Sequence, residues 1–172
     1  MPSHSVTVTR TTTTVSSSAI ILNIGFLKGV PGILKLLQLI IGIIIVGILS
    51  HYSTSWTIST RYDYRADLFY ILVAVAFFVT TFLLIVSGVI SLATASILPK
   101  TVFEYIYHAT AFLLYLIATI VYLTALIKRN DRYHYSQYPG YEAKMAAAVL
   151  GFLNSGLYLF SAIMAYRFTR VG

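Results

Sequence analysis

The stretch LFYILVAVAFFVTTFLLIVSGVIS, residues 68–91, decides the fold, because it is long, almost wholly apolar and free of charged residues. Three further long apolar runs occupy residues 33–50, 103–127 and 143–166. A helix needs about 20 predominantly apolar residues to cross the hydrocarbon core of a bilayer. The first run is slightly short, but its flanking residues can extend it. The chain is therefore predicted to be an integral, multi-pass membrane protein with four spans.

The overall composition leads to the same class. Hydrophobic residues make up 58% of the 172-residue chain and charged residues 10%, whereas a soluble domain usually carries about 25% charged residues. Transmembrane strands fit less well, because they alternate apolar and polar residues over segments of about 10 residues. The predicted fold class is all-α, an integral membrane four-helix bundle with short loops.

The expected domain organisation has three parts. Residues 1–30 are a Thr/Ser-rich tail, expected to be disordered, followed by an interfacial segment. The four-span domain occupies residues 31–167, and residues 168–172 form a short C-terminal tail. The loop around Pro99 and Lys100 is expected to be a tight helical hairpin. The N-terminal tail is interpreted as a solvated segment, with a phosphorylation cluster as the alternative.

The net charge of +7 does not indicate nucleic-acid binding. The basic residues are spread along the ends of the runs, where Lys and Arg commonly lie among lipid head groups. The count of basic residues does not settle the orientation, because six lie on each side of the membrane. On the side of the termini these are Arg10, Lys28, Lys35, Lys100, Arg167 and Arg170; on the other side they are Arg61, Arg65, Lys128, Arg129, Arg132 and Lys144.

No enzymatic site is visible in the sequence. There is no cysteine, which excludes disulfides, thiolate chemistry and cysteine-bound metal and argues against tetraspanins, claudins and connexins. The four histidines, His4, His51, His108 and His134, are far apart and do not form a metal-binding motif. The sequence therefore predicts neither catalytic residues nor a metal or cofactor.

Several polar, aromatic and small residues recur at helical spacing. Large residues of the third run repeat every seven positions, as in a heptad, and small residues of the fourth run repeat every four positions, which lets another helix approach closely. The predicted helix-packing or partner face consists of Gln38, Gly42, His108, Tyr115, Tyr122, Ala147, Gly151, Asn154 and Ser155. We expect this face to close the bundle on itself. The alternative is that the fourth run binds another membrane protein or a second copy of the chain.

Polar residues inside a membrane are functional candidates by default. Glu104 and His108 are one helical turn apart near a helix end, where they can pair, whereas Gln38 and Asn154 lie deeper. These residues suggest either a proton or ion relay or hydrogen bonds between helices. The second interpretation is preferred, because no run carries a charge at its middle.

A loose cholesterol-type pattern is also present. It consists of Leu116, Tyr122 and Lys128, each separated from the next by five residues. Matches to this pattern occur by chance in aromatic membrane proteins. Cholesterol is therefore a candidate partner alongside the membrane lipids in general.

The layout resembles the MARVEL-domain family. The run PGILKLLQLIIG, residues 31–42, is similar to the first span of that family, and FEYIYH, residues 103–108, is similar to the opening of its third span. The Ala/Gly/Asn stretch of the fourth run, through Asn154, is similar as well. The resemblance covers residues 31–167 and is greatest to small four-span members such as MAL and plasmolipin, the chemokine-like-factor group and the insect protein singles bar.

Membership would imply a non-enzymatic protein that organises membranes in vesicle trafficking, membrane apposition or cell–cell fusion. It would also imply an M-shaped bundle in the plasma membrane or in trafficking vesicles, with both termini cytoplasmic and with lipids and other membrane proteins as partners. An accessory subunit of one receptor or channel is the alternative, and a small transporter is a third interpretation.

Overall fold

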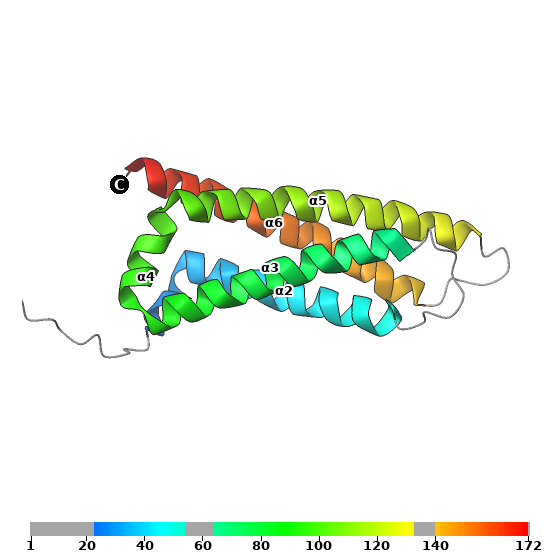
Figure 1. Ribbon diagram of the computed structural model, residues 1–172, viewed down its shortest axis with the longest axis horizontal. Helices are drawn as coiled ribbons and strands as arrows, with labels where there is room; N and C mark the ends of the chain where they lie inside the picture. The colour runs from blue at the N-terminus through cyan, green and yellow to red at the C-terminus, as the bar shows by residue number, and fades with distance from the viewer. Residues whose placement is uncertain (1–22, 54–63, 133–139, 172) are drawn as a thin grey trace, which may run out of the picture.

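The computed structural model describes residues 23–53, 64–132 and 140–171. Four long helices run side by side along the molecule (Figure 1), and each is long and apolar enough to cross a membrane. They are α2 (Val30–Ser53), α3 (Tyr64–Ile90), α5 (Val102–Asp131) and α6 (Tyr141–Val171). The described residues contain no strand. The predicted all-α membrane bundle is therefore confirmed.

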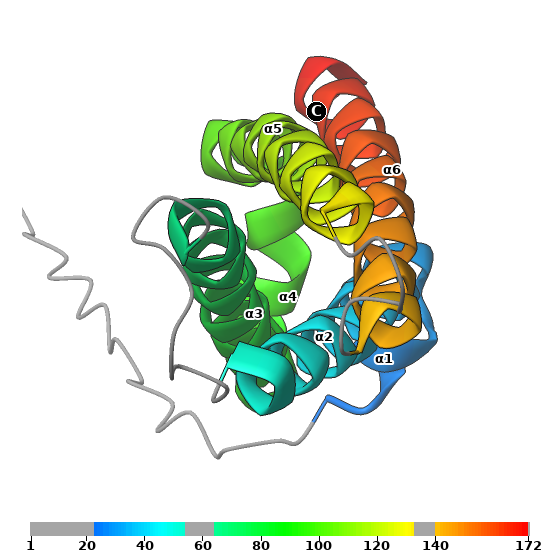
Figure 2. The same ribbon diagram turned by 90° about the vertical axis from the view of Figure 1, so that its right-hand side faces the viewer.

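Seen end-on, the four long helices form a four-sided ring in the order α2, α3, α5, α6 (Figure 2). Each helix packs against two neighbours: α2 and α5 each contact both α3 and α6. As a result, α2 faces α5 across one diagonal of the bundle, and α3 faces α6 across the other. This arrangement determines which side chains meet in the interior.

The inner face of each helix follows helical spacing. In α2, the buried residues include Leu34, Gln38, Ile45 and Leu49, which lie four or seven positions apart along the helix. The residues between them are also mostly apolar, and several are exposed on the outside of the bundle. Because lipid and protein interior both accept apolar side chains, hydropathy alone does not distinguish the two faces.

Three short elements close the end of the bundle that carries the C-terminus: α1 (Gly25–Lys28), α4 (Leu92–Ile97) and the 3₁₀ turn η1 (Leu98–Lys100). The segment containing α1 is attached to the end of α3. The backbone N–H of Asn23 donates to the carbonyl of Val89 at 2.7 Å. The ring of Phe26 lies so close to Gly88 that a Cβ there would meet it at 2.7 Å.

The connection between α3 and α5 is longer than the predicted tight hairpin. The Ser91 hydroxyl caps α4 by accepting from the N–H of Thr94 at 3.2 Å. The Thr101 hydroxyl caps α5 by accepting from the N–H of Glu104 at 3.4 Å. These two caps start new helices, so that α4 crosses the end of the bundle instead of turning back directly (Figure 1).

The described helices extend past some of the predicted boundaries. Helix α6 continues to Val171, through most of the predicted C-terminal tail, and α2 begins at Val30. The three-part division of the chain remains a prediction. The expectations about the Thr/Ser tail concern residues outside the described ranges.

Candidate functional site

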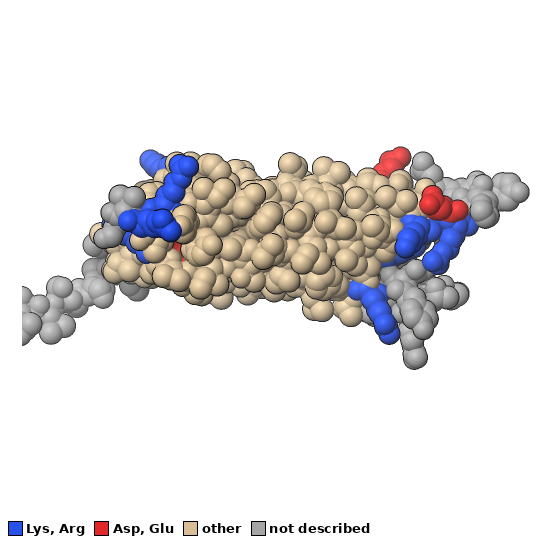
Figure 3. Space-filling view, turned by 90° about the horizontal axis from the view of Figure 1, so that it is seen from above, with Lys and Arg blue, Asp and Glu red and all other residues tan. Residues whose placement is uncertain are grey.

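The outer surface of the long helices is apolar. In the view of Figure 3, Lys, Arg, Asp and Glu gather at the two ends of the molecule, and the middle section carries none of them. The exposed side chains of the long helices include Leu72, Phe82, Leu113 and Leu153. This surface suits contact with acyl chains, and it leaves the interior as the place where polar chemistry is concentrated.

The most unusual interior feature is a charged cluster at the end that carries α4. Lys35 of α2 pairs with the carboxylate of Glu104 on α5, across the diagonal of the bundle. His108, one turn further along α5, places Nε2 3.2 Å from the same Glu104 oxygen. The three residues are only 1%, 2% and 1% exposed. Removing one partner from such a buried pair leaves an uncompensated charge and costs about 3–5 kcal/mol.

A small cavity of about 10 Å³ lies beside this cluster. Ser161 and Met164 of α6 line it together with Lys35, Glu104 and His108. Its volume is about that of one water molecule. Oε2 of Glu104 and Nδ1 of His108 have no hydrogen-bond partner among the described residues. The cluster is thus a compact polar site inside the bundle, too small for an organic substrate.

A second polar group ties three helices together near the middle of the spans. The hydroxyl of Thr81 on α3 lies 2.8 Å from the hydroxyl of Tyr107 on α5 and 2.8 Å from that of Tyr158 on α6. Closer to the other end, the hydroxyl of Tyr70 on α3 donates to the carbonyl of Ala147 on α6 at 2.7 Å. The Thr81–Tyr158 and Tyr70–Ala147 hydrogen bonds both join α3 to α6, which face each other across a diagonal of the bundle.

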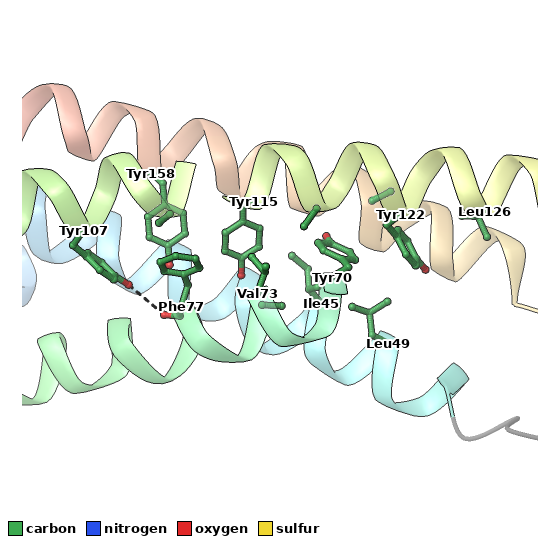
Figure 4. Close-up of a cluster of buried hydrophobic side chains, with 14 of the residues drawn as sticks. Ile45, Leu49, Tyr70, Val73, Phe77, Tyr107, Tyr115, Tyr122, Leu126 and Tyr158 are labelled. Atoms are coloured by element: carbon green, nitrogen blue, oxygen red, sulfur yellow. Dashed lines mark hydrogen bonds between the residues drawn. The ribbon is translucent and has the colours of Figure 1, made fainter. Parts of the chain in front are cut away.

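Aromatic rings fill the space around these hydroxyls (Figure 4). The ring of Tyr115 stacks on that of Tyr158 with centroids 5.5 Å apart, and Phe77 lies 5.9 Å from each of them. The rings of Tyr70 and Tyr122 are 4.8 Å apart. Such pairs add about 0.5–1.5 kcal/mol each beyond the burial of their surface, so they contribute to the stability of the core.

A second ion pair is found at the opposite end of the bundle. Arg129 of α5 and Asp67 of α3 form two parallel hydrogen bonds, with nitrogen–oxygen distances of 2.6 and 2.8 Å. This two-pronged geometry is the strong form of an Arg–carboxylate contact. Each end of the interior is therefore occupied by a charged pair that links two helices.

All nine predicted face residues lie inside this bundle. A Cβ on Gly151 would meet the Tyr70 and Thr119 side chains, and a Cβ on Gly42 would lie 3.6 Å from Phe78. The remaining seven are likewise buried: Gln38, His108, Tyr115, Tyr122, Ala147, Asn154 and Ser155. Their place favours packing within one chain over contact with a partner.

Direct hydrogen bonds account for some of these residues. Nε2 of Gln38 donates to the Ser161 hydroxyl at 2.9 Å, which joins α2 to α6. The Ser155 hydroxyl donates to the carbonyl of Phe112 at 3.3 Å, which joins α6 to α5. The ring of Tyr122, part of the cholesterol-type pattern, is fully buried and therefore out of reach of a lipid on the outer surface.

The sequence did not identify some of the most important polar residues. Lys35 and Arg129 were expected among the lipid head groups, yet both are buried in ion pairs. A signal for Lys35 exists: it lies three residues before Gln38 and ten before Ile45, on the same helix face. Thr81 and Asp67 carried no comparable signal, because their partners come from other helices.

A family model described as a membrane-associating domain, MARVEL, matches residues 26–164. The chain belongs to the MARVEL family. No curated protein and no solved structure matched the chain. The family match covers all four long helices up to the last turns of α6, and the suspected resemblance is thereby confirmed.

Among the described residues, no three His, Asp or Glu side chains come together in a way that would hold a metal ion. Several polar groups of this MARVEL domain form hydrogen bonds or ion pairs that link different helices.

Proposed function

We propose that the protein is a non-enzymatic membrane organiser that acts in vesicle trafficking, membrane apposition or cell–cell fusion. We propose that it resides in the plasma membrane, in trafficking vesicles or in both, with both termini cytoplasmic. Membership of the MARVEL family supports the membrane role. One observation carries the proposal: the interior is closed by the Lys35–Glu104 pair at one end and the Arg129–Asp67 pair at the other.

Because the two ion pairs close the interior, a function at the outer surface is favoured over transport through the bundle. A small transporter needs a polar path that opens to both sides, and the core between the two ion pairs is filled by aromatic and aliphatic side chains. The surface, in contrast, offers long apolar helix faces to lipids and neighbouring proteins. A compact bundle of this kind can influence membrane organisation through the proteins and lipids that gather around it, and cholesterol is one such lipid.

The proposal is tested by removing the protein from cells that express it and restoring it as the full chain. We expect slower delivery of membrane cargo to the cell surface, or fewer membrane contacts or fusion events, with rescue by the restored chain. Ion and proton flux into proteoliposomes containing the purified chain is measured in parallel and should match that of empty liposomes. Unchanged trafficking, contact and fusion, or a specific flux, would overturn the proposal.

Two glycines on the outer surface favour the second candidate, an accessory subunit of a receptor or channel. Gly47 of α2 and Gly156 of α6 are exposed, and a Cβ on either would meet no other atom within 4 Å. A glycine gives lipids little to contact but lets a neighbouring helix approach closely. A discrete stoichiometric complex with one other membrane protein in mild detergent would support this candidate; its absence would leave the membrane organiser.

A further inference from the structure

The groove between α1 and α4 is the feature that the proposed function does not use. It has a volume of about 330 Å³ and is open to the outside, within the range of about 300–1,000 Å³ common for small-molecule sites. Gly25 and Gly29 form part of one wall, and Ala95 and Ser96 form part of the other. These small residues leave the hollow between the two segments.

We expect the groove to lie at the level of the lipid head groups. Helix α3 ends at Ile90 and α5 begins at Val102, so α4 and η1 lie where two spans leave the membrane. In Figure 1, α4 runs across the direction of the long helices, as a helix in the plane of the interface does. The groove therefore opens at the boundary between head groups and acyl chains.

The elements that form the groove also expose large apolar side chains. Ile24, beside α1, is 61% exposed, and Leu92 and Ile97 of α4 are 61% and 62% exposed. Exposed apolar residues on a short interfacial helix are stabilised by insertion among acyl chains. The groove thus has an apolar side that suits the upper part of a lipid chain.

The charged residues next to the groove are basic. Lys28 directly precedes the groove residue Gly29, and Lys100 directly follows the groove residue Pro99; both lysines are exposed. Glu104, the acidic residue described at this end, is buried and held by Lys35. The remaining described carboxylates, those of Asp67, Asp131 and Glu142, belong to the opposite end of the bundle. The two lysines thus create a local positive field without an exposed described carboxylate nearby.

From these observations we infer that the groove between α1 and α4 binds an anionic phospholipid. The head group, with its phosphate and a further acidic group, lies by Lys28 and Lys100, and the adjoining chain lies along the apolar side by Leu92. The preceding part of this chain is a poorer occupant, because residues 1–22 contain no Asp or Glu and one Arg. Free phosphate would match the lysines but not the apolar side.

The experiment uses the full chain purified in a mild non-ionic detergent and analysed by native mass spectrometry. Phosphatidylserine and phosphatidylcholine with identical acyl chains are added in turn, and the fraction of protein that retains each lipid is measured. We expect the chain to retain phosphatidylserine about tenfold more strongly. Inorganic phosphate at millimolar concentration should leave the retained phosphatidylserine in place.

Three variants locate the site. The double change Lys28→Gln and Lys100→Gln should lower phosphatidylserine retention by about tenfold, since each basic residue near the lipid contributes a several-fold attraction. The matched double change Lys128→Gln and Arg167→Gln removes the same charge from exposed positions outside the groove and should stay within about twofold of the unchanged chain. Ala95→Leu fills the groove without changing charge and should also lower retention.

The thermal unfolding midpoint of each variant is measured first, so that loss of fold is separated from loss of the site. Equal retention of the two lipids by the unchanged chain would overturn the inference. So would equal losses in the two charge variants, displacement by phosphate, or full retention in a folded Ala95→Leu variant. The last result would assign binding to surface charge alone, outside the groove.

Discussion

Lys35 and Glu104 join two helices that are not neighbours in the bundle. Lys35 belongs to α2 and Glu104 to α5, and these helices face each other across a diagonal with α3 and α6 on either side. His108 supports the pair by contacting the same carboxylate oxygen. We therefore expect loss of this contact to loosen the whole end of the bundle.

Lys35→Met should destabilise the protein by about 3–5 kcal/mol, because it leaves the buried Glu104 carboxylate with His108 as its remaining described partner. Thermal unfolding in detergent or unfolding in SDS measures the loss. Combining it with Glu104→Gln should restore part of the stability, since the unpaired charge is then removed. The exposed Lys128 provides the control, and Lys128→Met should change stability by less than about 0.5 kcal/mol. Equal effects of the two single changes would contradict the prediction.

Gly151→Leu should destabilise the bundle by at least about 1–3 kcal/mol, because the new side chain meets Tyr70 and Thr119 in a packed interior. Gly156→Leu is the matched control on the same helix, since its side chain would enter open space. We expect the control to leave the unfolding midpoint unchanged or slightly raised, given the poor helix propensity of glycine. Crosslinking in membranes is measured alongside. Reduced crosslinking by a fully stable Gly151→Leu variant would instead assign this face to a partner.

Thr81→Val should cost about 1–3 kcal/mol, because it removes the hydroxyl shared by Tyr107 and Tyr158 from the interior. Tyr158→Phe removes one of the two bonds and should cost less, about 0.6 kcal/mol as is typical between membrane helices. Tyr166→Phe, on the exposed side of α6, is the control. A Thr81→Val variant as stable as the control would show that these bonds add nothing to packing.

Single cysteines at Ser17 and Ser136 should place the N-terminus in the cytoplasm and the loop before α6 outside. The chain contains no cysteine of its own, so an impermeant thiol reagent reports on each site alone. We expect Ser136→Cys to react on intact cells and Ser17→Cys to react only after permeabilisation. The reverse pattern would contradict the proposed orientation and weaken the trafficking proposal.

The spans were predictable from sequence, but their inner faces were predictable only in part. A long run such as residues 68–91 has few alternatives to a membrane helix. Within it, however, buried Tyr70 and exposed Leu72 are both compatible with lipid, so hydropathy does not indicate which faces inward. The heptad repeat of Tyr115 and Tyr122 predicted one helix face from ring size and spacing rather than from hydropathy, and both rings are buried in the bundle.

The α3–α5 connection and the two ion pairs were not predicted from the sequence, and each has a physical reason. Thr101 and Glu104 form the pattern of a residue that caps a helix followed three positions later by Glu, which marks a helix start and argues against a tight hairpin there. Lys35 was assigned to the lipid head groups from its position near a helix end, although its helix face points inward. Pairs such as Arg129 and Asp67 depend on how distant helices are arranged, which one sequence does not contain.

The contacts that cross the bundle have a mechanical consequence. A four-sided frame joined only along its edges can shear into a flattened shape, but a strut along a diagonal prevents this. Lys35 and Glu104 brace one diagonal, while Thr81 with Tyr158 and Tyr70 with Ala147 brace the other. These contacts oppose shearing of the cross-section, so when a membrane bends or thins around the protein, we expect the surrounding lipids to change their shape to fit it.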